Sequence, residues 1–67
     1  MEKNEQTVAS RLITGLVLKG FEKEAACVLT AILETDSQKL DLIAWMVMNR
    51  QAEMHDITLK AIEIATQ

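Results

Sequence analysis

Apolar residues recur at intervals of three and four along most of this 67-residue chain, and that spacing restricts it to helices. No segment shows the sustained alternation of apolar and polar residues that a half-buried strand requires. The chain has no proline and only two glycines, and good helix formers such as Ala, Leu, Glu, Lys, Gln and Met dominate it. We therefore expect an all-α protein, and the length predicts a single helical domain over residues 1–67.

Residues that end or begin helices mark the breaks between the apolar stripes. Lys19 and Gly20 follow the first stripe, and a glycine there can adopt the left-handed conformation common after a helix C-terminus. Thr35 and Gln38 have the spacing of a capping box, and Asp36 or Ser37 could also cap the helix that restarts there. These signals predict helices over residues 5–18 and 22–34, with a third beginning near residue 37.

Residues after 37 allow two interpretations. They contain neither Gly nor Pro, so one long C-terminal helix over 37–66, with dimerisation as its consequence, fits the spacing. Alternatively the chain turns at residues 49–51, where Asn49 could take a left-handed conformation. A shift of 30 residues aligns 12–33 with 42–63 at six identical positions and favours the turn. The predicted fold is two consecutive helical hairpins forming a small bundle, with helices near 5–18, 22–34, 37–48 and 52–66.

A further pattern occupies the run 12–29 and consists of Leu12, Leu16, Gly20, Ala25 and Leu29. This run resembles the helix-turn-helix unit of tetratricopeptide and pentatricopeptide repeats, over about a quarter of the chain. The resemblance implies a hairpin in which the glycine forms a tight turn and the small Ala25 lets the helices approach closely. Four positions depart from the pattern, with larger or charged residues where small ones are usual: Ile13, Ile32, Arg50 and His55.

The third predicted helix is apolar on every side, because only Asp41 is polar between residues 40 and 48. A domain of roughly 60 residues buries only about 60% of its unfolded surface, so we expect this chain to self-associate, most simply as a symmetric homodimer. The expected oligomer or partner interface comprises Leu42, Trp45, Met46, Met48 and Met54. Further partner contacts are expected at the hairpin ends, from Phe21, Arg50 and His55. The alignment of the two halves also pairs Gly15 with Trp45, so Gly15 is expected to accept the indole ring, either within one chain or between chains.

The chain offers little for catalysis or metal binding. It has one cysteine and one histidine, too few for an internal disulfide or a zinc site, and Cys27 is expected in the core as a small apolar residue. We therefore expect no enzyme activity and no cofactor. The longest apolar run, residues 42–48, is far shorter than the roughly 20 residues that cross a bilayer. The first residues lack the apolar core of an export signal, so we expect no membrane association and a cytoplasmic location.

The net charge distinguishes between the two remaining functions, nucleic-acid binding and protein binding. Seven basic residues are dispersed among ten acidic ones, giving a net charge of −3, which disfavours nucleic acid as a partner. A nucleic-acid-associated helical repeat protein is the alternative. The sequence favours a small acidic protein–protein interaction module: an adaptor, assembly factor or inhibitor that binds a larger protein, one with a basic surface being the natural complement.

Overall fold

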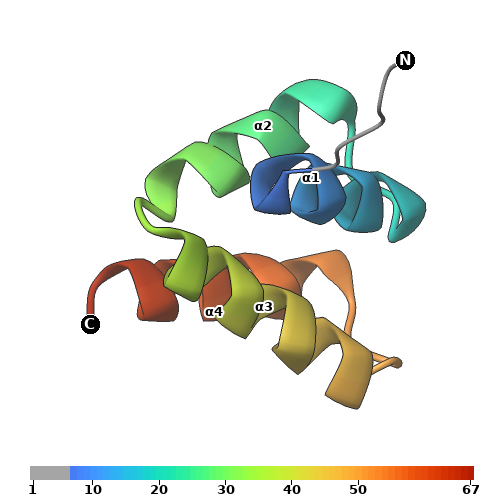
Figure 1. Ribbon diagram of the computed structural model, residues 1–67. Helices are drawn as coiled ribbons and strands as arrows, with labels where there is room; N and C mark the ends of the chain where they lie inside the picture. The colour runs from blue at the N-terminus through green and yellow to red at the C-terminus, as the bar shows by residue number, and fades with distance from the viewer. Residues whose placement is uncertain (1–6) are drawn as a thin grey trace.

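The structure is a computed structural model that describes residues 7–67, and it contains four helices within that range (Figure 1). They are α1 (Val8–Leu18), α2 (Lys23–Ile32), α3 (Asp36–Met48) and α4 (Met54–Ala65). No strand occurs in the part of the chain that is described. The all-α fold of two consecutive hairpins is confirmed, and the turn over residues 49–53 excludes one helix over 37–66. Thr7 caps α1, and the helix start expected at residue 5 lies outside the described residues.

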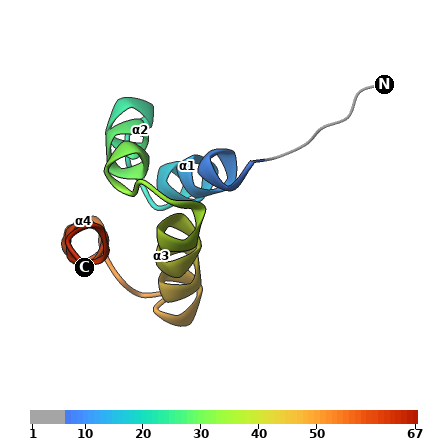
Figure 2. The same ribbon diagram turned by 60° about the vertical axis from the view of Figure 1, so that its left-hand side comes forward.

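The two hairpins form two layers, with α1 and α2 in one and α3 and α4 in the other (Figure 1). Helix α1 packs on α3, and α2 packs on α4, so the equivalent helices of the two hairpins lie side by side (Figure 2). The apolar core fills the space between the layers and draws on all four helices and the connections. Its members are Leu12, Leu16, Phe21, Ala26, Leu29, Leu33, Leu42, Ile57, Ala61 and Ile64.

The turn between α1 and α2 depends on Gly20, which has φ +112°. The Gly20 N–H donates to the Val17 carbonyl (3.0 Å) and the Phe21 N–H donates to the Leu16 carbonyl (3.1 Å). These two bonds form a Schellman motif, and the buried Phe21 and Leu16 supply its apolar contact. The predicted left-handed glycine is confirmed.

The turn after α3 uses different chemistry. Asn49 has φ −121°, so the expected left-handed asparagine is wrong. Its backbone N–H (2.9 Å) and its side-chain amide (2.8 Å) instead both donate to the Trp45 carbonyl in the last turn of α3. The helix can therefore end without a positive φ.

The start of α3 has the predicted capping box. Thr35 Oγ1 accepts a hydrogen bond from the Gln38 N–H (3.1 Å), and Gln38 Oε1 accepts from the backbone N–H groups of Glu34 (2.8 Å) and Thr35 (3.4 Å). The Gln38 amide also donates to the Ile64 carbonyl (3.2 Å), which ties the start of α3 to the end of α4.

The buried face of α2 differs in part from the stripe that apolar spacing predicts, which is Ala25, Val28, Leu29, Ile32 and Leu33. Ala26, Leu29 and Thr30 are buried, whereas Val28 is 61% exposed and Cys27 is exposed, so the expectation of a core cysteine is wrong. Apolar residues lie on most sides of this helix, so two overlapping faces each have the three- and four-residue apolar spacing of a buried face. The small Ala26 suits the close helix contact, and the Thr30 hydroxyl donates to the Ala26 carbonyl (2.8 Å), so the hydroxyl of this buried residue is paired.

The internal repeat holds for α1 and α3 but slips by one residue in α2 and α4. Leu12 and Leu42, 30 residues apart, are both fully buried. The α1–α2 connection spans 19–22 and the α3–α4 connection spans 49–53, one residue longer. The buried positions of α2, together with Leu33 just after it, therefore match those of α4 at a shift of 31. The matched pairs are Ala26 with Ile57, Thr30 with Ala61 and Leu33 with Ile64.

A methionine side chain packs next to each of the two glycines. A Cβ at Gly15 would lie 3.5 Å from Met46 Cε, and one at Gly20 would lie 3.4 Å from Met54 Sδ. The neighbour of Gly15 within the chain is thus Met46, so the expected pairing of Gly15 with Trp45 is wrong within one chain, and a pairing between chains stays a prediction. Trp45 is one residue before Met46 on α3, and its side chain therefore points away from α1 and toward α4.

Candidate protein-binding groove

A groove of about 750 Å³ opens between the C-terminal end of α3, the following turn and α4. We call it the α3–α4 groove, and its lining residues are Trp45, Met48, Asn49, Arg50, Gln51, Ala52, Asp56, Leu59, Lys60 and Glu63. A smaller hollow of about 390 Å³ extends it toward the end of the chain and shares Trp45, Met48, Asn49 and Lys60.

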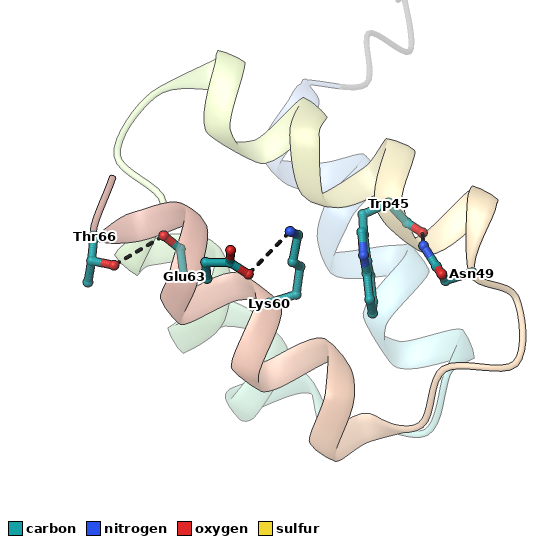
Figure 3. A network of polar contacts seen from close by, with 5 residues as sticks. All are labelled: Trp45, Asn49, Lys60, Glu63 and Thr66. Carbon is teal, nitrogen blue, oxygen red and sulfur yellow. Dashed lines mark hydrogen bonds and ion pairs between the residues drawn. The ribbon is translucent and has the colours of Figure 1, made fainter.

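Trp45 supplies the largest side chain of the groove. Leu42 and Met46 on α3 pack in and against the core, which leaves Trp45 on the flank of the helix that faces α4, half-buried against that core. Figure 3 shows the indole ring from α3 and the Lys60 side chain from α4 both directed into the space between these two helices. The hydrogen bond from Asn49 to the Trp45 carbonyl fixes the backbone at this end of α3.

Two exposed apolar side chains flank the indole. Met48, the last residue of α3, is 81% exposed, and Leu59 of α4 is 53% exposed. Met48 lies one helical turn after Trp45, and Leu59 lies outside the buried stripe of α4 that Ile57 and Ala61 define. The groove thus carries an apolar strip that water covers in the isolated chain.

The charged residues of the α3–α4 groove balance. Two cations, Arg50 and Lys60, stand against two carboxylates, Asp56 and Glu63, whereas the whole chain carries −3. Lys60 Nζ lies 3.2 Å from Glu63 Oε1, the one ion pair shorter than 4.0 Å between residues 7 and 67 (Figure 3). Asp56 Oδ2 accepts a hydrogen bond from the Glu53 N–H (3.2 Å) in a capping box at the start of α4.

Arg50 is held through its backbone and not through its side chain. Its carbonyl accepts a hydrogen bond from Lys19 Nζ (2.8 Å), which links the turn of one hairpin to the turn of the other. The guanidinium has no carboxylate within 4.0 Å in the described part of the chain. Arg50 therefore presents a positive charge at the turn end of the groove.

The structure brings together three of the residues that the sequence singled out, Trp45, Met48 and Arg50. Leu42 and Phe21 are instead buried in the core of the chain itself, which corrects their expected role as contact residues, because they fill the space between the two hairpins. Three others lie elsewhere: Met46 packs at Gly15, Met54 packs at Gly20 and is 45% exposed, and His55 is exposed on α4 outside the groove.

Sequence reasoning missed the α4 side of the groove. The repeat aligns Leu59 with Leu29, which is buried at 8% exposure, and so implies that Leu59 is also a core residue. The extra residue in the α3–α4 turn gives the position of Leu29 to Lys60 and turns Leu59 outward. The length of the α3–α4 turn decides that Leu59 faces outward, and no residue in the sequence marks where this turn ends.

Large exposed apolar side chains are found both inside and outside the groove. The nine large ones among the described residues are Val17, Leu18, Val28, Leu40, Val47, Met48, Met54, Leu59 and Ile62. Three belong to α3, and Val47 is 66% exposed. The chain alone therefore leaves much of its most apolar helix uncovered.

No group of three or more His, Cys, Asp or Glu residues within residues 7–67 is placed to hold a metal ion. The helices of this same range are all too short or too polar to span a bilayer. Comparison of the chain with protein-family models, with curated proteins and with solved structures finds no match. The functional conclusion below therefore rests on the geometry and chemistry of the groove.

Proposed function

We propose that this chain is a small protein-interaction module that works as a homo-oligomer and docks on a larger protein, as an adaptor, assembly factor or inhibitor. The observation that carries the proposal is the exposed strip of Trp45, Met48 and Leu59 along one groove. Burying apolar surface stabilises a contact by about 25 cal/mol per Å², and tryptophan is enriched among the residues that dominate binding energy. Clustered exposed apolar side chains are typical of protein contact surfaces.

The shape and charge of the groove favour a protein partner. It is open along two helices, and such grooves accept the apolar face of another helix. Its two cations are matched by two carboxylates, so it offers phosphate groups no excess of positive charge, which is what nucleic acids require.

Two matched variants test the proposal. Met48 and Leu18 are the last residues of equivalent helices, 30 positions apart, and each is 81% exposed. Leu18 is not a lining residue of the groove. Met48→Lys therefore changes the groove, and Leu18→Lys makes the same kind of change at an equally exposed site, neither with a cost to the core.

The assay is capture in a lysate of the native host, with a photo-crosslinking side chain placed at Gln51 inside the groove. We expect a protein partner to be crosslinked by the otherwise unchanged chain and by Leu18→Lys, and to be lost with Met48→Lys. Loss in both variants, capture in both, or no crosslinked partner would contradict the proposed function.

A further inference from the structure

We infer that a second copy of this chain occupies the α3–α4 groove, with the two grooves facing each other across a two-fold axis. The inference rests on the proposed function and assigns this groove to the contact within the homo-oligomer, so a larger protein that binds the groove competes with the second copy. Three properties would suit the groove to this arrangement. Its charges should sum to about zero, it should carry a charged group that a second copy can pair, and its exposed surface should be large enough to hold a dimer.

Charge supplies the first argument. A two-fold axis places the same patch on both sides of the contact, so a patch of one sign would repel itself. The α3–α4 groove sums to zero charge, with Arg50 and Lys60 against Asp56 and Glu63, in a chain of net charge −3. The groove is therefore a face on which two acidic copies can meet without net repulsion.

Arg50 supplies the second argument. Within residues 7–67 its guanidinium has no carboxylate within 4.0 Å, although both groove carboxylates lie on the same surface. A two-fold axis through the groove would place the Arg50 of each copy opposite the groove of the other copy, which carries Asp56 and Glu63. Arginine suits such a contact because its planar group binds a carboxylate through two parallel hydrogen bonds.

Surface area supplies the third argument. A stable dimer of standard size buries about 800 Å² on each partner. The accessible surface of the chain is 4671 Å², so such a contact would use about one sixth of it. The smaller hollow that adjoins the groove shares Trp45 and Met48 with it and adds Ala44 on the same side of α3.

The test measures the mass of the chain in solution by sedimentation equilibrium. The expected mass at micromolar concentration is twice the chain mass of 7.5 kDa. Met48→Lys is expected to raise the dimer dissociation constant at least about a hundredfold, because the contact contains this side chain twice and each buried methionine is worth a factor of about ten or more. Leu59→Lys approaches the groove from α4 and is expected to act in the same direction. Leu18→Lys is expected to leave the dimer intact.

Trp45 fluorescence provides a local reading of the same contact, because Trp45 is the only tryptophan of the chain. Its emission should shift to shorter wavelength as the concentration rises, in the unchanged chain and in Leu18→Lys, and should stay constant in Met48→Lys. Arg50→Glu should weaken the dimer, and added salt should reduce that weakening, because the new carboxylate faces those of the second copy.

Two results would overturn the inference. One is a mass of 7.5 kDa with constant Trp45 emission over the whole concentration range. The other is a dimer that survives Met48→Lys and Leu59→Lys and dissociates with Leu18→Lys, which would place the contact on another face. A monomer whose Gln51 crosslinker still captures a larger protein in a Met48-dependent way would remove the second copy and leave the proposed interaction function standing.

Discussion

The same chemical change, glycine to alanine, should have opposite effects on stability at the two glycines of this chain. Gly15 lies inside α1 with ordinary helical geometry, and its new methyl group would meet only Met46 Cε at 3.5 Å, a normal van der Waals distance. Gly15→Ala should therefore stabilise the fold by about 0.5–1 kcal/mol, the difference in helix preference between the two residues. Gly20 has φ +112°, which a residue with a Cβ rarely adopts. Gly20→Ala should destabilise the fold by about 1–2 kcal/mol.

Urea unfolding followed by far-UV circular dichroism measures both effects, with all proteins at one concentration. The midpoints should move in opposite directions while the dependence of the unfolding free energy on urea stays unchanged. The nearest contact of the Gly20 methyl group, Met54 Sδ at 3.4 Å, is also ordinary, so the backbone alone accounts for the expected loss. A Gly20→Ala protein as stable as the parent would refute the Schellman turn. A Gly15→Ala protein destabilised by more than about 1 kcal/mol would show that α1 and α3 approach more closely than the contact with Met46 allows.

Three further predictions concern the core, a cap and a thiol. Leu12→Ala removes a fully buried side chain and should cost about 2–5 kcal/mol, comparable with the whole stability of a small domain, so circular dichroism should show a largely unfolded chain while Leu18→Ala changes little. Thr35→Ala removes the acceptor for the Gln38 N–H and should cost about 1 kcal/mol in chemical unfolding; an unchanged midpoint would contradict the capping box. Cys27 should react with a thiol reagent in the native protein within a few-fold of its rate in urea, because it is exposed, and strong protection would contradict its position on α2.

The parts of the fold that depend on local signals could be predicted from the sequence. Gly20 after a cation, and Thr35 three residues before Gln38, fix two of the helix ends through hydrogen bonds that involve only near neighbours. The repeat located the second turn because Leu12 and Leu42 have equivalent places in the core. For these positions, spacing and turn chemistry are sufficient.

The faces of the second helix in each hairpin could not be predicted in the same way. In α2, Ala26 and Cys27 are adjacent small residues, and only the contact with neighbouring helices decides which one is buried. In α4, the longer turn shifts the register by one residue. Lys60 therefore takes the position equivalent to Leu29, and Leu59 faces outward. These are tertiary effects, since helix preference and apolar spacing are nearly the same for both registers.

The groove was predicted on one side only, for a related reason. Trp45 and Met48 were identified because α3 is too apolar to be covered by so short a chain, and both lie in the groove. The α4 side depends on where α4 begins, at Met54 and not at residue 52. The sequence therefore predicted the α3 side of the groove but not the α4 side.

The most direct test of whether the α3–α4 groove is a contact surface is hydroxyl-radical footprinting of the native protein as its concentration rises. Met48 and Leu18 start from the same 81% exposure, so the fractional change of each labelling rate from its own value in dilute protein can be compared in one sample. Association through the groove predicts that labelling of Met48 and Trp45 falls several-fold while that of Leu18 stays constant. Constant labelling of Met48 at every concentration, or protection of Leu18 in its place, would contradict it.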